Sequence, residues 1–192
     1  QAVNTVKNEN GKLIGHISDG EGFVMACQNK GWHVQGQKIV ILGAGGAACA
    51  ILVALAKAGA KEIIVYNRSD KPFIRTLAQQ LNCSIVLKAL DHYEELKKDL
   101  SDAYLLIQTT NVGMSPHTDQ CLIDESYLSS QLKVADIIYN PLETKLLSMA
   151  KEKGLEYMNG EGMILYQGAV SFEFWTGQKM PISEVKKALG ME

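Results

Sequence analysis

Residues 38–59 read KIVILGAGGAACAILVALAKAG, and this stretch decides the fold. It opens with a continuous apolar run, which is typical of a parallel strand buried on both faces. Gly43 to Gly46 interrupt that run, and an Ala/Leu-rich segment that favours a helix continues to Gly59. A second apolar run over residues 62–66 completes a β-turn-α-β unit.

The same alternation of strand and helix patterns extends over the rest of the chain. Two short extended segments joined at Asn8-Glu9-Asn10-Gly11 precede residue 20, and Asp91 is expected to cap one of the later helices. Strands alternating with helices predict an α/β fold, a Rossmann-like doubly wound and mostly parallel sheet with helices on both faces. Further strands are predicted over residues 84–87, 104–107 and 134–138, helices over 20–30, 71–81, 92–100, 143–153, 163–176 and 183–189, and connections over 108–120 and 157–162.

Composition and charge narrow the class of protein. The 192 residues carry a net charge of −2 with no dense basic run, so neither nucleic acid nor an anionic membrane is expected as a partner. No apolar stretch reaches the length of a membrane span, and no signal peptide is recognised. Four scattered cysteines without a C-x-x-C pair favour reduced thiols in a cytoplasmic protein, and the four histidines do not have metal-ligand spacing.

The glycine turn after residue 42 predicts a dinucleotide site. It consists of Gly43, Ala44, Gly45, Gly46 and Ala47. Gly43 can make the sharp turn, Gly45 lets a pyrophosphate approach the backbone, and the following helix offers unpaired N–H groups at its positive dipole end. The alternative is a tight turn that holds no ligand.

The end of the second strand bears on the choice of cofactor. Asn67 stands where NAD enzymes carry the acid that binds the ribose hydroxyls, while Arg68 and Ser69 can bind a 2′-phosphate. This pattern favours NADP(H). Asp70 leaves NAD(H) open, since a carboxylate can bind a bare ribose diol, and Asp70 can equally serve as the cap of the following helix.

Several further segments occur in a specific order and spacing. They are Ala2-Val3-Asn4-Thr5, Gly15-His16-Ile17-Ser18-Asp19-Gly20, Val112-Gly113-Met114, Asp136-Ile137-Ile138-Tyr139-Asn140-Pro141, Thr144-Lys145-Leu146-Leu147, Gly160-Glu161-Gly162-Met163, Gln167-Gly168-Ala169 and Phe172-Glu173-Phe174-Trp175-Thr176-Gly177. Together with the glycine turn, these segments resemble the shikimate dehydrogenase family in its C-terminal cofactor-binding part. The segment Asn67-Arg68-Ser69-Asp70 resembles the quinate/shikimate branch of that family, which uses NAD or NADP.

The resemblance implies a reaction and a set of site residues. The reaction is the reversible, NADP(H)-dependent reduction of 3-dehydroshikimate to shikimate, a step toward chorismate and the aromatic amino acids, with quinate as the alternative substrate. Asp19 matches the catalytic aspartate that handles the proton at the reacting oxygen. Asn4, Asp19, Tyr139 and Gln167 match substrate ligands. The nicotinamide site is matched by Asn111, Ile137, Tyr139 and Gly160, and Val112, Ile138 and Asn140 are further expected cofactor-binding residues.

Other interpretations remain open at this stage. Taken alone, Asp19 is a cap for the helix that starts at Gly20, and Gln167 is one polar residue on an apolar helix. The family has Asn-Thr where this chain has Ile17-Ser18, so any contact by that asparagine is missing. Alternatives to the main prediction are a quinate-preferring or aminoshikimate enzyme, a non-catalytic NADP-binding sensor or scaffold domain, and a Rossmann domain for another nucleotide. A homodimer is the alternative to a monomer.

The resemblance also implies a division of the chain. Residues 1–19 are expected to be the end of a truncated N-terminal substrate domain, residues 20–162 the NAD(P)-binding Rossmann domain, and residues 163–192 C-terminal helices that pack back toward the substrate domain. The family's catalytic lysine and two substrate-binding serines lie upstream of the segment that matches Asn4, and the first residue here is Gln1. We therefore expect a fragment.

This expectation predicts that residues 1–192 bind the cofactor without ordinary turnover, because hydride transfer needs the lysine that pairs with the aspartate. A steady-state assay of this chain with shikimate and NADP+ measures it. An ordinary rate of NADPH formation would contradict the prediction.

Overall fold

The computed structural model describes residues 2–191, which form a parallel six-stranded sheet and a separate antiparallel hairpin. The strands are β1 (Thr5–Glu9), β2 (Lys12–His16), β3 (Lys38–Leu42), β4 (Glu62–Asn67), β5 (Ser84–Ala89), β6 (Leu105–Gln108), β7 (Lys133–Asp136) and β8 (Tyr157–Met158). The helices are α1 (Asp19–Asn29), α2 (Gly46–Lys57), α3 (Pro72–Gln80), α4 (Tyr93–Ser101), α5 (Lys145–Glu152), α6 (Glu161–Thr176) and α7 (Ile182–Leu189), with a 3-10 turn η1 (Glu125–Tyr127).

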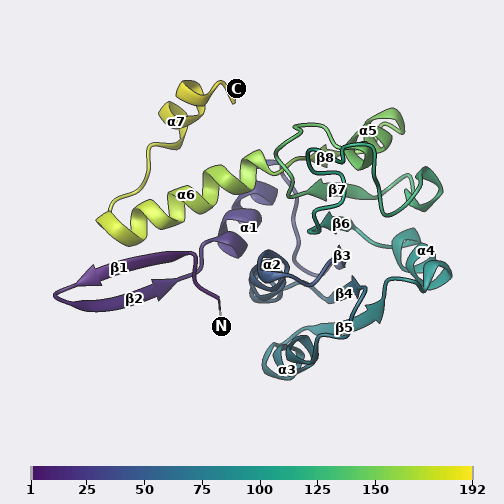
Figure 1. Cartoon of the computed structure of the whole chain (residues 1–192), viewed down its shortest axis with the longest axis horizontal. Helices are drawn as coiled ribbons and strands as arrows, with labels where there is room; N and C mark the ends of the chain where they lie inside the picture. The colour runs from purple at the N-terminus through teal and green to yellow at the C-terminus, as the bar shows by residue number, and fades with distance from the viewer. Residues whose placement is uncertain (1, 192) are drawn as a thin grey trace.

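The sheet has the strand order β5-β4-β3-β6-β7-β8, and each neighbouring pair is parallel. The order therefore reverses between β3 and β6, which makes the carboxyl ends of these two strands the switch point where such sheets bind ligands. Helices cover both faces (Figure 1). The predicted doubly wound α/β fold is confirmed.

The central strands are apolar on both sides because each face of the sheet has its own core. Ile39 and Ile41 point to a core shared with α1, α2 and α6, whereas Val40 and Leu42 point to a core shared with α4 and α5. Successive side chains of a strand alternate between faces, so one continuous apolar run serves both cores. Within the described residues, no helix is long and apolar enough to cross a membrane.

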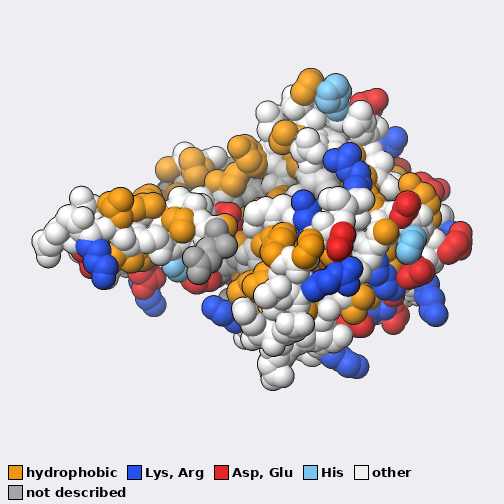
Figure 2. All heavy atoms as spheres, turned by 60° about the horizontal axis from the view of Figure 1, so that its bottom comes forward, with side chains coloured by type: hydrophobic (Ala, Val, Ile, Leu, Met, Phe, Trp, Pro, Cys, Tyr) orange, Lys and Arg blue, Asp and Glu red, His pale blue; other side chains and the backbone are white. Residues whose placement is uncertain are grey.

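The hairpin β1-β2 lies beside α6, away from the sheet (Figure 1). Its turn at Asn10-Gly11, with φ of 52° and 86°, confirms the predicted turn. The Trp175 indole donates to the Val6 carbonyl at 3.0 Å, and the rings of His16 and Phe174 stack with centroids 5.1 Å apart. Apolar side chains are exposed along the hairpin and the adjoining part of α6 (Figure 2). Leu13 of β2 and Trp175 of α6 are among the exposed residues.

Two predicted strand boundaries were wrong. Residues 157–162 were expected to be a connection, yet Tyr157 and Met158 pair with β7 as the edge strand β8, which is too short to give a periodic pattern. The strand predicted to reach Ile138 ends at Asp136. The Asp136 carboxylate accepts the Ile138 N–H at 3.0 Å, so this N–H is not available to a neighbouring strand.

Two predicted caps were also wrong. His92, not Asp91, occupies the N-cap of α4, where the first turn closes through the Leu96 N–H and the His92 carbonyl. Lys71, not Asp70, occupies the N-cap of α3. Asp70 is one residue too early to cap the helix, and its carboxylate accepts instead from the Lys71 N–H and from Arg75.

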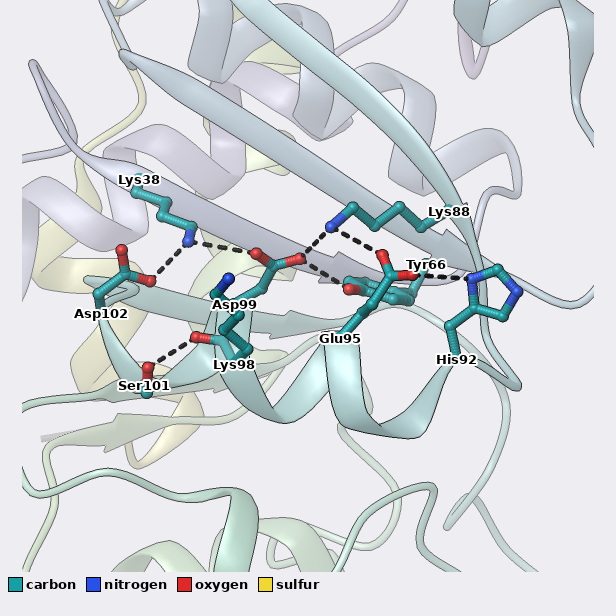
Figure 3. A network of polar contacts seen from close by, with 9 residues as sticks. All are labelled: Lys38, Tyr66, Lys88, His92, Glu95, Lys98, Asp99, Ser101 and Asp102. Atoms are coloured by element: carbon teal, nitrogen blue, oxygen red, sulfur yellow. Dashed lines mark hydrogen bonds and ion pairs between the residues drawn. The ribbon is translucent and has the colours of Figure 1, made fainter.

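A polar network lies between the sheet and α4 (Figure 3). One oxygen of Asp99 accepts from the Tyr66 hydroxyl at 2.7 Å and from Lys88 at 2.8 Å, and the other accepts from Lys38 at 3.3 Å. Burial alone raises the pKa of Asp99, but the hydrogen bonds from Lys88 and Tyr66 outweigh it and hold that pKa below its ordinary value. Asp99 thus ties β3, β4 and β5 to one helix.

Replacing Asp99 by Asn is expected to lower the free energy of unfolding by roughly 3 kcal/mol at pH 7, because Lys38 and Lys88 keep their charge and lose their shared partner. Because the pKa of Asp99 is lower in the folded chain than in the unfolded chain, its carboxylate stabilises the fold fully at pH values above the unfolded pKa, near 3.8. This stabilisation is lost as the pH falls through the pKa of the folded state. Urea unfolding at pH 7 and pH 3 should therefore show a difference between the two proteins that shrinks in acid.

The control is Asp102→Asn, since Asp102 contacts the same Lys38 but its side chain is 68% exposed. Its expected cost is below about 1 kcal/mol, as for an exposed ion pair. An equal loss of unfolding free energy in the two variants would show that Asp99 is not the centre of the network.

Candidate cofactor and substrate site

The turn after β3 requires glycine at its first position. Gly43 has a φ of +104°, and its N–H donates to the Tyr66 carbonyl of β4 at 2.8 Å. A Cβ added to Gly43 would lie 2.7 Å from the Thr109 hydroxyl oxygen. Any side chain would therefore strain the backbone and push away the chain that follows β6.

The remainder of the turn is open toward solvent. Gly45 is the N-cap of α2 and Gly46 its first residue, and a Cβ added at either would have no atom of the described structure within 4 Å. Ala44 is buried beneath the turn, and Ala47 is half-buried. The first turn of α2 contains no acidic residue, so its free N–H groups can donate hydrogen bonds to an anion such as a diphosphate.

The loop after β4 lies next to this turn. The Asn67 amide donates to the Ser69 carbonyl at 2.7 Å, which folds the loop on itself. Arg68, Ser69 and Asp70 are exposed. Asp70 is paired with Arg75 at 3.1 Å, whereas the ion pairs formed among residues 2–191 do not include Arg68.

The remaining cofactor candidates follow β6, β7 and β8. Asn111 and Val112 lie in the loop after β6, and residues 137–140 lie in the loop after β7. The Gly160 N–H, at the N-terminus of α6, donates to the Ile138 carbonyl at 2.9 Å. Ile137 is half-buried, Ile138 is buried, and Tyr139 and Asn140 are exposed. The predicted cofactor residues thus all follow the carboxyl ends of parallel strands.

A second group of predicted residues meets at the N-terminus of α1. The Asn4 amide donates to a carboxylate oxygen of Asp19 at 2.8 Å and to the Ser18 hydroxyl at 3.1 Å. The Ser18 hydroxyl donates to the Gln167 amide oxygen at 3.1 Å. Asn4, Asp19 and Gln167 therefore form one cluster, although they come from three separate segments: the residue before β1, the start of α1 and the middle of α6. Tyr139 shares none of these hydrogen bonds.

This cluster is held by three hydroxyl groups that the sequence analysis did not single out. Thr5 and Ser171 are buried and lie 2.8 Å apart, and the Ser171 hydroxyl donates to that of Ser18 at 3.0 Å. One signal was present, because Ser171 follows Gln167 by four residues and so lies on the same face of the helix. Thr5 and Ser18 gave no comparable signal.

The interpretation of Asp19 as a helix cap was wrong. Ser18 occupies the N-cap of α1, and Asp19 is the first residue of the helix, with its carboxylate bonded to Asn4. A Cβ added to the next residue, Gly20, would lie 2.1 Å from the Ala50 carbonyl oxygen. The start of α1 therefore lies against the second turn of α2, one turn away from the open glycine segment.

Sequence profiles of known families match most of the chain. The family described as "Shikimate / quinate 5-dehydrogenase" matches residues 25–140, and the "Shikimate 5'-dehydrogenase C-terminal domain" matches residues 160–189. The chain belongs to the shikimate/quinate dehydrogenase family. The predicted resemblance is confirmed, and with it the class of oxidoreductase.

Individual members of this family match over nearly the whole chain. Shikimate dehydrogenase (NADP(+)) from Alkaliphilus oremlandii is 43% identical, covering 98% of this chain and 67% of that protein. The structure of shikimate 5-dehydrogenase from Listeria monocytogenes with shikimate and NAD has a TM-score of 0.91 at 38% identity, covering 98% of this chain and 68% of that one. Quinate dehydrogenase from Corynebacterium glutamicum with NAD has a TM-score of 0.85 at 26% identity, covering 100% and 68%.

This chain therefore spans about two thirds of the length of these dehydrogenases. The part matched by the first family model includes the glycine turn after β3.

The cluster of Asn4, Asp19 and Gln167 depends on the close approach of α1 and α6. A Cβ added to Gly22 would lie 2.4 Å from the Gln167 backbone nitrogen. Gly22→Ala is expected to push the helices apart, break the Ser18–Gln167 hydrogen bond and cost roughly 1–3 kcal/mol, as other overpacked contacts do. Thermal unfolding measures the cost, and a crystal structure measures the distance.

Gly168→Ala is the matched control, because it makes the same change in α6 where nothing lies within 4 Å of the added carbon. This variant is expected to gain up to about 1 kcal/mol, since alanine favours a helix. A stable Gly22→Ala protein with an unchanged Ser18–Gln167 distance would refute the close-packing argument.

Proposed function

We propose that this chain binds NADP(H) and supplies part of the substrate site for the reversible reduction of 3-dehydroshikimate to shikimate. The family and the NADP(+) specificity named for the Alkaliphilus oremlandii relative support this function. The observation that carries it is the contact between α1 and α2, which joins the open glycine turn to the cluster of Asn4, Asp19 and Gln167.

The arrangement suits hydride transfer to a ketone of a polyhydroxy acid. Bound NADPH supplies the hydride, and the chain supplies orientation and a proton partner. Asn4 and Gln167 present amide groups that can bind hydroxyls. Asp19 is half-exposed, and because Asn4 holds one of its carboxylate oxygens, its other oxygen can face the reacting substrate oxygen and exchange a proton there.

The proposed preference for NADP(H) over NAD(H) depends on Arg68 and Asp70. Arg68 is exposed at the end of β4 and can pair with a 2′-phosphate. Asp70 would repel that phosphate, but the Lys71 N–H and the Arg75 guanidinium hold its carboxylate and offset its charge. The NAD complex of the Listeria monocytogenes relative keeps NAD(H) as the alternative cofactor.

Quinate is the alternative substrate, and one observation favours it. The quinate dehydrogenase from Corynebacterium glutamicum has the same fold over the whole chain. Quinate has a saturated ring and one more hydroxyl group than shikimate, and the side chains of this cluster can bind hydroxyl groups that both acids carry. Relative rates with the two acids distinguish these proposals.

The proposed organisation keeps three parts. Residues 1–19 belong to the substrate domain, residues 20–162 bind the cofactor, and residues 163–192 return to the substrate domain, which the contact of α6 with β1 supports. The cytoplasm is the proposed compartment, in line with four unpaired cysteines, and a homodimer is the proposed alternative to a monomer.

Calorimetric titration tests the cofactor proposal. Arg68→Ala is expected to weaken NADP+ binding by roughly 10- to 100-fold, the value of charge-assisted hydrogen bonds to a phosphate, and to leave NAD+ binding within about twofold. Lys98→Ala removes the same charge from the exposed surface of α4 and controls for net charge. Tighter binding of adenosine monophosphate than of NADP+ to the unaltered chain would refute the proposal.

A further inference from the structure

Two neighbouring strands of the sheet end in buried polar side chains. β6 ends at Gln108 and β7 at Asp136, and the two residues are partners in the parallel register. Gln108 is 3% exposed and Asp136 is 1% exposed. Carboxylates and amides are costly to bury, so their partners indicate what these side chains do.

Both oxygens of the Asp136 carboxylate bind the loop that follows β7. One accepts the Ile138 N–H at 3.0 Å, and the other accepts the Thr144 hydroxyl at 2.8 Å. Thr144 is the N-cap of α5 and in turn accepts the Leu147 N–H. Asp136 therefore fixes both ends of residues 137–144.

Gln108 does the same for the loop after β6. Its amide oxygen accepts the Thr110 N–H and the Thr110 hydroxyl, each at 3.0 Å. Its amide nitrogen donates to the Val112 carbonyl at 2.9 Å, and the Val112 N–H donates back to Thr110 at 3.2 Å. This closed set of bonds fixes residues 109–112, which contain Asn111.

Burial of the Asp136 carboxylate removes it from water and so disfavours its charged form. Burial raises the pKa of Asp136 to about 6, against hydrogen bonds from Ile138 and Thr144 that lower it. No lysine, arginine or histidine forms an ion pair with this carboxylate among residues 2–191. Within these residues, the hydrogen bonds from Ile138 and Thr144 are therefore what offsets the burial of this carboxylate.

The two loops are also bonded to each other and to α6. The Ser115 N–H donates to the Asn140 carbonyl at 3.2 Å, and the Gly160 N–H donates to the Ile138 carbonyl. Gln108 and Thr144 line the same small cavity of about 10 Å³ beneath the loops. Gln108 and Asp136 thus hold the two loops together at the carboxyl edge of the sheet. We term residues 109–112 and 137–140 the loop wall.

We propose that Gln108 and Asp136 are positioning residues for the nicotinamide half of the cofactor, acting through the loop wall and not by touching the ligand. This inference rests on the proposed function, in which Arg68 binds the 2′-phosphate of the adenosine half. It also rests on the family resemblance, which places Asn111, Ile137 and Tyr139 of the loop wall on the nicotinamide side. Loss of either side chain should disturb one half of the cofactor and spare the other.

The test compares NADPH with 2′,5′-ADP, which has the adenosine half alone. Asp136→Ala and Gln108→Leu should each raise the Kd of NADPH by roughly tenfold, the effect of losing buried hydrogen bonds, and keep the Kd of 2′,5′-ADP within about twofold. The fluorescence change of bound NADPH, which reports on the nicotinamide ring, should fall in both variants.

Asp136→Asn should restore binding, because its amide oxygen can accept the Ile138 N–H and its amide nitrogen can donate to the Thr144 hydroxyl. Asp102→Asn makes the same chemical change at an exposed site at the end of α4 and should leave both ligands unaffected. Should Asp136→Ala fail to fold, Thr144→Val removes one of the two bonds at nearly constant volume and should show the same selective loss.

Equal weakening of NADPH and 2′,5′-ADP would overturn the proposal, because it would mean general destabilisation. Unchanged NADPH binding by folded Asp136→Ala would overturn it as well. An unaltered chain that binds 2′,5′-ADP but gives no nicotinamide fluorescence change overturns the positioning role alone, whereas one that binds neither ligand overturns the proposed function.

Discussion

The close contact between Gly43 and the chain after β6 is the constraint on which the ligand edge depends. Gly43 reverses the backbone at a φ of +104° while its N–H remains bonded to β4 and its α-carbon faces Thr109. A glycine there lets β3, β4 and β6 end side by side at one level. The N-terminus of α2 then faces outward with its amides unshielded, which is the requirement for holding a diphosphate.

Glycines in α1 allow this helix to pack closely against α2 and α6. Gly20 and Gly22 occupy the first turn of α1, one against α2 and the other against α6, at distances where no side chain fits. Close helix approach brings short hydroxyl side chains within bonding distance, so Thr5, Ser18 and Ser171 can link three elements. The larger polar groups of Asn4, Asp19 and Gln167 are held at the rim of this buried set.

The sequence predicted the parts of the molecule that depend on local patterns. The β-turn-α-β unit around Gly43, the hairpin turn at Asn10-Gly11 and the helix that carries Gln167 followed from periodicity and turn chemistry. The contact between the Thr5 and Ser171 hydroxyls was not predictable, because these residues are 166 positions apart and meet only where β1 packs against α6. The short β8 was missed because two residues carry no period.

The position of α1 has a mechanical consequence. This one helix carries Asp19, is bonded through Ser18 to both Asn4 and Gln167, and lies directly against the α2 backbone at Gly20. The carboxylate of Asp19, which we propose exchanges the proton, and the turn proposed to hold the diphosphate are thus linked by the direct contact of α1 with α2. The proposed hydride donor and its proposed proton partner are therefore positioned by the same pair of helices.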